Sequence, residues 1–487
     1  MDEQNTIRPK LAVLSEAQIE QIHHDSLRIL ATVGVRVDSA RARQAFARAT
    51  MPPRVEGERV YLPGELVEWA LQAASRSVEI YDRRGNAAFE LPGAARFGMG
   101  VTSLYYQDPE SETVTPFGRQ HMETLARLGQ GLGSFDVIST LGIVQDVPAE
   151  VSDLYATLEM VANSTKPLVL LISADEAFAA VLDLLEHLHG DLAARPFVVP
   201  YLNPITPLVI NKGTSDKMFA CAGRGLPFIY SNYGMAGAST PITPAGSLVL
   251  LNAELLAGLV LSQLIKAGTP IILGSLPAFF DMRGLASFYD PSSYLVDLAC
   301  AEMMVHYGLP HCGTSGSGMG WGADLIAAGH QWFNHLISCL GKVGLVPFIG
   351  DNLGAKAYSP TVAVFANEVI TQARGFAMGF RLDDGSVGLG EIAEVGPGGS
   401  FLTSPSTLEL LRRAYYQSPL WQNLTLEEWQ ARGRPRAGDV LRRYTTELLR
   451  EAQAPEDHDE LMARGQAFID GLAGRGGGGA GQHRQLQ

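Results

Sequence analysis

The order of apolar and polar positions changes near residue 117. Beyond it, short runs rich in Val, Ile and Leu alternate with longer stretches whose apolar residues recur at the spacing of an amphipathic helix. These runs predict eight strands, at residues 135–144, 167–173, 197–203, 227–232, 270–275, 309–315, 345–350 and, as the weakest, 391–396. Eight strands separated by helical stretches predict a (β/α)8 TIM-like barrel, with a doubly wound open sheet as the alternative.

The regions on either side of this repeat have other patterns. Ser15 and Gln18 form a capping box before a helix that Gly34 ends, and mixed helix and strand signals follow. The end of the chain has helical patterns and then a run of glycines. We therefore expect an N-terminal α+β extension over residues 1–116, the barrel over 117–404, a C-terminal helical segment over 405–472 and a flexible glycine-rich tail over 473–487.

Charge excludes one class of partner. The 487 residues include 37 basic and 51 acidic side chains, a formal charge of −14, and no run of Lys or Arg could follow a phosphate backbone. Nucleic acid is therefore not an expected partner. The N-terminal MDEQNTIRPK lacks the apolar run of a signal peptide, which favours a cytoplasmic location.

The most apolar stretch, residues 247–265, is interrupted by Asn252, Glu254 and Gln263, so it predicts a buried helix rather than a membrane span. The four cysteines are widely spaced: Cys221, Cys300, Cys312 and Cys339. No C-x-x-C pair occurs among them, and neither a disulfide framework nor a structural metal site is expected.

In a barrel, the residues just beyond the C-terminal end of each strand face one common mouth. The expected mouth residues are mainly amides, hydroxyls, aromatic rings and carboxylates: Ser173, Asn203, Asn232, Tyr233, Leu276, Phe279, Phe280, Asp281, Thr314, Ser315, Asp351 and Asn352. They include no His, Cys and Asp cluster with metal spacing. The mouth is therefore expected to bind and orient a ligand without a metal ion.

Aromatic residues lie in or beside these predicted loops: Tyr105, Tyr106, Tyr233, Phe279, Phe280, Trp321 and Trp332. Aromatic faces can hold a quaternary ammonium group by cation–π attraction, although each ring could instead belong to the core. Small residues, among them Gly234 and Gly237, follow the sequence Tyr-Ser-Asn-Tyr at 230–233. They either leave room for a flat ligand to approach or form a turn packed under a neighbouring loop.

Two glycine-rich loops carry further hypotheses. Residues 313–322, GTSGSGMGWG, contain Gly316 and Gly318 beside Trp321 and predict a roomy wall for a large cofactor, a plain flexible loop or a phosphate nest without the P-loop ending. Residues 395–402, VGPGGSFL, follow the eighth expected strand, the usual phosphate position of a barrel. A phosphate ligand is therefore the second hypothesis.

Three ionisable residues could be functional or structural. His330 and His335 are five positions apart on an expected helix and do not share a face, so they do not predict a metal pair. His330 could act as an acid or base, or be a satisfied core histidine. Glu254 lies within an apolar helix, where a carboxylate must be paired or used because its burial is costly.

Several segments resemble the trimethylamine methyltransferase family, which also contains glycine betaine methyltransferases. The resemblance is carried by LSEAQIEQIHHDSLRILATVGVRV near the N-terminus, GLPFIYSNYG, GMAGASTPITPAGSLVLLNAELLAGLVLSQLIKAGTPIILG, PAFFDMRG, AEMMVHYGLP and VGPGGSFLTSPSTLELLR. It spans about residues 14–449. It implies a barrel that transfers a methyl group from a methylated amine to the cobalt(I) of a separate corrinoid protein, in methanogenesis-related chemistry.

The same resemblance implies the cofactors and partners. The chain itself would bind no cofactor, because the corrinoid (cobalamin) is carried by the partner protein, and the chain could form a homo-oligomer. The trimethylamine enzymes proper carry pyrrolysine, whereas this chain contains only the ordinary twenty residues. It is therefore similar to the non-pyrrolysine branch, for which the resemblance implies a quaternary amine donor such as a betaine.

Site roles follow from this interpretation, with no residue assigned as catalytic. The substrate-binding candidates are Asn203, Asn232, Tyr233, Phe279, Phe280, Asp281, Arg283, Trp321 and His330. The aromatic rings and Asp281 would hold the cation, and an amide or Arg283 would hold a substrate carboxylate. Small residues would clear the approach of the corrin ring: Gly234, Gly237, Gly316 and Gly318.

One segment departs from the family pattern. Many relatives have a D-x-Q-A-x-x-E-like helix start after the sixth strand. Here Asp324 and Ala327 match it, but Ile326 and His330 stand at the glutamine and glutamate positions. Two alternatives therefore stay open: a barrel lyase or isomerase acting on a phosphorylated substrate, and a non-catalytic amine-binding relative.

Overall fold

The computed structural model describes residues 5–313 and 318–476. Eight parallel strands form a closed ring in chain order. They are β7 (Arg96–Met99), β10 (Val137–Ser139), β11 (Leu168–Leu170), β12 (Val198–Leu202), β14 (Phe228–Ala236), β15 (Ile271–Asp281), β17 (His311–Cys312) and β18 (Leu345–Ile349). Because β18 pairs with β7, the ring is closed. The predicted (β/α)8 barrel is confirmed, and the open sheet is excluded.

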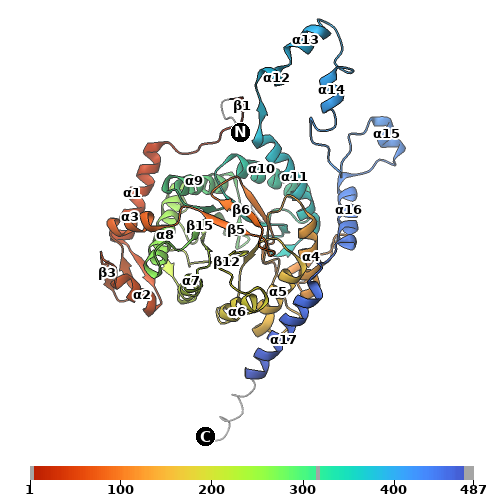
Figure 1. The fold of residues 1–487 in the computed structure, drawn as a ribbon. Helices are drawn as coiled ribbons and strands as arrows, with labels where there is room; N and C mark the ends of the chain where they lie inside the picture. Colours follow the sequence, from red (N-terminus) through yellow and green to blue (C-terminus); the bar gives the residue numbers. More distant parts are fainter. Residues whose placement is uncertain (1–4, 314–317, 477–487) are drawn as a thin grey trace.

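Each barrel strand is followed by a helix on the outside of the ring (Figure 1). The helices are α4 (Arg119–Gly131), α5 (Ala149–Asn163), α6 (Ala177–His189), α7 (Lys212–Arg224), α8 (Pro244–Ile265), α9 (Pro291–Tyr307), α10 (Leu325–Leu340) and α11 (Pro360–Met378). Alternate strand residues pack outward against these helices and inward into the barrel. In β12, for example, Val198 and Leu202 pack in the helix-facing core, whereas Val199 and Tyr201 belong to the barrel interior.

The expected eighth strand is wrong. Residues 391–396 belong mostly to the helix α13 (Leu389–Val395), outside the barrel. The eighth barrel strand in space is instead β7, which lies within the expected N-terminal extension of residues 1–116. A Cβ on Gly98 of this strand would lie 2.6 Å from the Pro347 carbonyl oxygen and 2.7 Å from Val137 Cγ2. The close approach of neighbouring strands therefore requires glycine in a segment that gave a weak strand signal.

The N-terminal residues form a small α+β layer against α8. It contains α1 (Glu16–Thr32), β2 (Val35–Val37), α2 (Ala40–Ala47), β3 (Arg54–Glu56), β4 (Arg59–Tyr61) and α3 (Gly64–Ala73). The Ser15 capping box before α1 is confirmed. The strand β13 (Val209–Ile210) of the β12–α7 loop joins this layer by pairing with β2. The layer thereby orders a loop at the barrel mouth.

A hairpin closes the opposite end of the barrel. β5 (Val78–Tyr81) and β6 (Ala87–Leu91) pair antiparallel and lie across the centre of the ring of helices in Figure 1. Val78, Ile80, Phe89 and Leu91 pack in one cluster with the inward-facing side chains of the barrel strands. The hairpin therefore fills the barrel interior from the end opposite the C-terminal mouth.

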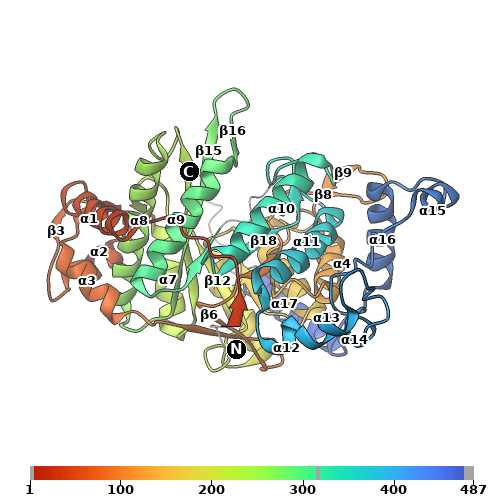
Figure 2. The same ribbon diagram turned by 90° about the horizontal axis from the view of Figure 1, so that it is seen from above.

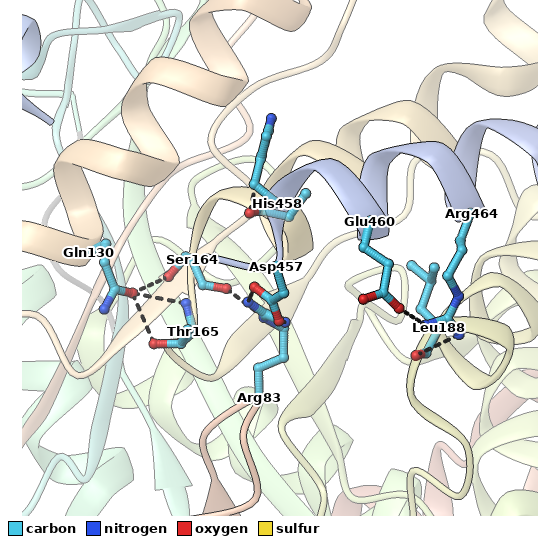
Figure 3. A network of polar contacts seen from close by, with 10 residues as sticks. Arg83, Gln130, Ser164, Thr165, Leu188, Asp457, His458, Glu460 and Arg464 are labelled. Carbon is cyan, nitrogen blue, oxygen red and sulfur yellow. Dashed lines mark hydrogen bonds and ion pairs between the residues drawn. The ribbon is translucent and has the colours of Figure 1, made fainter. Parts of the chain in front are cut away.

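The C-terminal helix and the residue before it hold the β5–β6 hairpin against the barrel wall (Figure 3). Arg83, in the β5–β6 turn, donates two hydrogen bonds of 2.6 and 2.7 Å to the Asp457 carboxylate and one of 2.9 Å to the Ser164 carbonyl oxygen. Asp457 precedes α17 (His458–Gly476), which packs on α5 and α6. Arg464 of α17 donates to the carbonyl oxygens of His187 and Leu188.

The predicted C-terminal helices are present and end later than expected. They are α12 (Asp384–Val387), α13, α14 (Pro405–Leu410), α15 (Leu426–Ala431), α16 (Ala437–Glu451) and α17. Because α17 runs to Gly476, its last four residues fall in the range 473–487 expected to be a tail. The remainder of that range lies outside the described residues.

The apolar helix α8 is the one helix of the described chain with the length and composition to cross a membrane. Its most apolar 18-residue window is 83% buried within the protein. The interpretation of this segment as a core helix is therefore confirmed.

Further short strands complete the fold at the mouth and near the N-terminus. At the mouth, β8 (Tyr105–Gln107) and β9 (Val114–Pro116) pair with β19 (Asp351–Asn352) and β20 (Ala357–Tyr358). β16 (Ala286–Phe288) turns back on β15. Near the N-terminus, β1 (Thr6–Ile7) pairs with β21 (Phe380–Arg381).

Candidate functional site

A cavity of about 1070 Å³ lies at the C-terminal mouth of the barrel. Five aromatic residues line it: Tyr201, Tyr233, Tyr289, Trp321 and Phe348. Apolar side chains such as Val101, Leu171, Leu276 and Ile326 contribute most of the remaining wall. An apolar cavity with a few polar groups, at this position of the fold, has the properties of a small-molecule site.

Strand alternation brings the aromatic rings together. Tyr201 and Asn203 share the inward face at the end of β12, and Tyr233 has the same parity as the inward-facing Ile229 of β14. Tyr201 packs edge-to-face on Phe348 of β18, with ring centroids 4.8 Å apart. Burial raises the pKa of the Tyr201 and Tyr233 hydroxyls, so both stay neutral.

The polar lining is sparse and contains one charge. Thr102, Asn203 and Ser287 contribute polar side chains, and Lys356 is the charged residue among the described lining residues. The Asn203 amide donates 2.9 Å to the Ser231 carbonyl oxygen, which fixes the orientation of its side chain. The cavity therefore combines neutral aromatic faces with one cationic group.

The loop that carries Trp321 is held at both sides of the residue. The Trp321 backbone N–H donates 2.9 Å to Asp324 Oδ2, and its carbonyl oxygen accepts 3.2 Å from Gln107 Nε2. Asn352 in turn donates to Gln107. Asp324 also caps α10 through Ala327 N, so the helix start fixes the tryptophan. The indole side chain is 73% exposed at the cavity rim.

The predicted residues of the β15 loop lie outside the cavity lining. β15 continues to Asp281 and pairs with β16 as a hairpin that projects beyond the mouth (Figure 2). Phe279 packs on Phe288 across the hairpin, and Asp281 accepts hydrogen bonds from the backbone of Arg283 and Gly284 at its tip. Phe280 is half-buried on the same strand and Arg283 is exposed. The returning chain instead places Ala286, Ser287 and Tyr289 in the cavity wall.

Asn232 also points away from the cavity. It lies between the inward-facing Ser231 and Tyr233, and its amide donates to the Leu251 carbonyl oxygen and to Glu254 Oε2, at 2.9 and 3.0 Å. Glu254 further accepts from Thr206 Oγ1 and from the Leu208 backbone. Burial raises the pKa of Glu254 to about 7, against the opposing effect of these donors. Its role is to attach α8 to the β12–α7 loop.

The small residues proposed to clear an approach have separate structural roles. A Cβ on Gly234 would lie 2.7 Å from Leu251 Cδ2, toward α8, so this glycine permits strand–helix packing. Gly237 has φ +90° in the turn after β14, where a side chain would be strained. Gly318 lines the cavity and has φ +84° beside the backbone of Ala355. Gly316 lies outside the described residues, as do the expected mouth residues Thr314 and Ser315.

His330 lies behind the cavity wall, one layer from the ligand space. Its Nδ1 is 3.3 Å from the Tyr294 hydroxyl, and Tyr294 stacks on the cavity residue Tyr289. Burial lowers the pKa of His330, so the imidazole is neutral at pH 7. His335 is fully buried with its ring edge-to-face against Phe97 of β7, and burial lowers its pKa to about 3.

Asp351 lies in β19 at the mouth, as expected, but its side chain is fully buried and does not line the cavity. Burial raises the pKa of this carboxyl to about 8, so it is mostly protonated at neutral pH. The described lining residues include Lys356 and no carboxylate.

The second glycine loop is remote from the cavity. Residues 395–402 lie among α12, α13 and α14, outside the barrel wall and away from the β15–β16 hairpin (Figure 2). They do not follow a barrel strand. The premise of the phosphate hypothesis, a nest after the eighth strand, is therefore wrong.

No group of three or more His, Cys, Asp or Glu side chains in the described parts of the chain has the arrangement to hold a metal ion. Cys221, Cys300 and Cys312 are buried free thiols, and Cys339 is half-buried. The lining residues that sequence reasoning missed include Tyr201, Tyr289, Phe348 and Lys356. The alternation of side chains along a strand could have predicted Tyr201, because it lies two positions before Asn203 and faces the same side. Tyr289 and Lys356 reach the cavity from loops whose paths the sequence does not define.

Comparison with known proteins identifies relatives along nearly the whole chain. The family described as trimethylamine methyltransferase (MTTB) matches residues 2–473. A glycine betaine methyltransferase of Desulfitobacterium hafniense is 28% identical over 474 residues, which cover 95% of this chain and 97% of the relative. A trimethylamine methyltransferase of Methanosarcina thermophila is 26% identical over 466 residues, which cover 93% and 96%.

A solved structure supports the fold alone. The monomethylamine methyltransferase of Methanosarcina barkeri superposes with a TM-score of 0.51 at 8% identity, covering 94% of this chain and 88% of that one. The family matches almost every residue of the chain, and the structure is a closed barrel with a cavity at its C-terminal mouth. The chain belongs to the trimethylamine methyltransferase family.

Proposed function

We propose that this protein transfers a methyl group from a zwitterionic quaternary amine, of the betaine type, to the cobalt(I) of a corrinoid carried by a partner protein. The observation that supports the donor most directly is the cavity lining, in which five aromatic residues accompany Lys356, the charged residue among the lining residues that the structure describes. The similarity to a glycine betaine methyltransferase agrees with this donor class.

The chemistry of the donor matches the lining. A nitrogen bearing four carbons has no proton to donate, so its positive charge must be held without a hydrogen bond. Aromatic faces meet that need by cation–π attraction. A purely cationic donor would be repelled by Lys356, whereas the carboxylate of a betaine can pair with its ammonium group. The arrangement thus favours a zwitterion over a simple cation.

Methyl transfer from such a donor needs no proton from the protein. The electron pair of cobalt(I) forms the new cobalt–carbon bond, the carbon–nitrogen bond breaks, and its electron pair remains on nitrogen. Cobalt becomes formally cobalt(III), and a neutral tertiary amine leaves. The tasks of the chain are to align one N-methyl group with the open mouth and to exclude water from the reacting atoms.

Asn203 and Lys356 are the groups that we expect to orient the donor. Asn203 is fixed by its hydrogen bond to the Ser231 carbonyl oxygen, and Lys356 lies on the loop that faces Gly318 and Trp321. A cavity of about 1070 Å³ is larger than a small betaine requires. The remaining space at the mouth is available to the methyl acceptor. A cytoplasmic location and a link to methanogenesis stay predictions.

The test is spectroscopic. The protein is mixed with cobalt(I) cobalamin and separately with glycine betaine, other quaternary amines, trimethylamine and a sugar phosphate, and methylcobalamin formation is followed by its absorption. We expect methylcobalamin with betaine-type donors and no response to the sugar phosphate. Tight binding of a betaine without methylcobalamin, in the presence of a corrinoid protein as acceptor, would instead identify a non-catalytic amine-binding relative.

A further inference from the structure

The lining of the mouth cavity changes in character with depth. Five of its residues also belong to the apolar cluster inside the barrel or pack against it, and we call them the floor: Val101, Leu171, Tyr201, Leu276 and Phe348. Tyr201 and Phe348 are 4% and 6% exposed, whereas Trp321 at the rim is 73% exposed. The deep end of the cavity is therefore an apolar surface shielded from solvent.

The floor side chains suit an apolar ligand group. Tyr201 is the floor residue with a polar side-chain atom, and its hydroxyl oxygen is buried, so the cavity meets its ring. Two polar lining residues elsewhere donate to backbone carbonyl oxygens, Thr102 to Thr140 at 3.4 Å and Asn203 to Ser231 at 2.9 Å. A polar group on the floor would lose its hydration without gaining a hydrogen bond from these side chains, which is costly.

The groups expected to hold the two charges of the donor lie outside the floor. Tyr233 and Tyr289 belong to a separate cluster on the side wall. Lys356 is exposed at the rim, on the loop that pairs with Gly318. Leu276 of the floor is the register partner of Tyr233 on the neighbouring strand. The floor therefore begins beside a ring that would hold the quaternary nitrogen.

Glycine betaine is too small to fill both the charge-holding wall and the floor. The cavity volume of about 1070 Å³ is that of pockets which hold much larger, drug-sized ligands. The methyl acceptor cannot use the floor, because in-line transfer places the methyl group between nitrogen and cobalt, and the floor lies on the far side of the donor from the mouth. An unfilled floor lacks the contacts that a fitted ligand would make.

The α-carbon of a betaine can direct a further group to the floor. It bears the quaternary nitrogen, the carboxylate and two other substituents, which are both hydrogen in glycine betaine. With the nitrogen against Tyr233 and Tyr289 and the carboxylate at Lys356, the other two substituents point away from the side wall and the rim. A side chain in place of one hydrogen would therefore extend toward the floor.

We propose that the donor is the N-trimethyl derivative of an α-amino acid with an apolar side chain, such as leucine or phenylalanine, and that this side chain lies on the floor. The inference rests on the proposed function and narrows its donor. Cobalt(I) supplies the electron pair of the new cobalt–carbon bond, and the breaking carbon–nitrogen bond leaves its pair on nitrogen. The product is the N,N-dimethyl amino acid. Each methylene buried on the floor raises affinity roughly fourfold.

The experiment titrates the protein calorimetrically with glycine betaine, N,N,N-trimethylleucine and N,N,N-trimethylasparagine. The last two have side chains of similar shape, so they separate an apolar floor from ligand size alone. Methylcobalamin formation from each compound and cobalt(I) cobalamin is followed in parallel. The floor variant is Leu171→Asn, and the matched control is Leu295→Asn on α9, which is 54% exposed and absent from the described cavity lining. Circular dichroism establishes that each variant is folded.

We expect the wild type to bind the leucine derivative at least about tenfold more tightly than either other compound. This comparison decides the question even where Leu171→Asn is unstable. Folded Leu171→Asn should reduce the preference at least about threefold, and Leu295→Asn should keep it.

Two results would overturn this inference alone. One is glycine betaine or the asparagine derivative binding as tightly as the leucine derivative while methylcobalamin still forms. The other is a folded Leu171→Asn variant that keeps the full preference. Failure of every betaine to bind and to yield methylcobalamin would overturn the proposed function as well.

Discussion

Replacement of Lys356 by methionine removes the positive charge from the cavity and keeps the length of the aliphatic side chain. Lys356 is the charged group among the described lining residues, and none of them carries a carboxylate. We therefore expect a betaine to pair its carboxylate with this lysine, and tetramethylammonium, which has no carboxylate, to be repelled by it. The two ligands should respond to the substitution in opposite directions.

The size of the effect follows from the exposure of the lysine. A hydrogen bond to a charged group contributes about 1.5–3 kcal/mol when it is shielded from water. Lys356 is exposed to solvent, so screening reduces the expected loss to about 0.5–1.5 kcal/mol, or roughly twofold to twelvefold in affinity for glycine betaine. Tetramethylammonium should bind equally well or slightly better.

Calorimetric titration of both ligands measures this difference directly. Lys342→Met is the matched control, because Lys342 is also exposed and does not line the cavity. Unchanged betaine affinity in Lys356→Met would refute the role of the lysine. An equal loss for both ligands would show that the substitution disturbs the loop rather than a carboxylate contact.

Two further predictions concern the cage and the wall of the barrel. Trp321→Leu keeps apolar bulk and removes the indole ring. The binding free energy of any quaternary ammonium ligand should therefore weaken by about 0.5–1 kcal/mol, roughly twofold to fivefold in affinity at an exposed site. Unchanged affinity in the same titration would show that Trp321 does not contact the cation. Burial raises the pKa of Glu254 to about 7 from its ordinary 4.5, so the folded protein holds this proton more tightly than the unfolded chain does. The contribution of Glu254 to stability is therefore complete below about pH 4.5 and is lost as pH rises through about 7. Glu254→Gln abolishes this titration. Between about pH 4.5 and 7, the free energy of unfolding in urea should fall by up to about 3 kcal/mol more for the wild type than for the variant. Parallel curves of unfolding free energy against pH would contradict the assigned pKa.

The barrel could be predicted because seven of its strands are apolar runs between helical stretches. The first strand escaped prediction for a local reason. Gly98 must be small where β7 passes the Pro347 backbone, so the strand lacks the β-branched residues that mark the others. Conversely, residues 391–396 gave a weak strand pattern, but they lie among the helices α12, α13 and α14 outside the barrel, and no described strand pairs with them. Tertiary context, which the local pattern does not contain, decided both cases.

The site was predictable only as far as strand ends define it. Asn203 and Tyr233 reach the cavity because they have inward parity, whereas Asn232, one residue away, has the opposite parity and joins Glu254. Trp321 was found through its loop. Phe279 and Asp281 were misplaced because β15 does not stop at the mouth but continues into a hairpin. Lys356 gave no signal, since its loop acquires a direction only by pairing with the Gly318 loop.

We propose that this cavity binds a betaine with its methyl groups toward the mouth. A crystal structure of the protein with glycine betaine tests this binding mode most directly. We expect density for the ligand within the aromatic lining, with the quaternary nitrogen against Tyr233, Tyr289 and Trp321 and the carboxylate toward Lys356. An empty cavity at saturating ligand, or a ligand bound with its carboxylate against the aromatic rings and its methyl groups at Lys356, would contradict this binding mode.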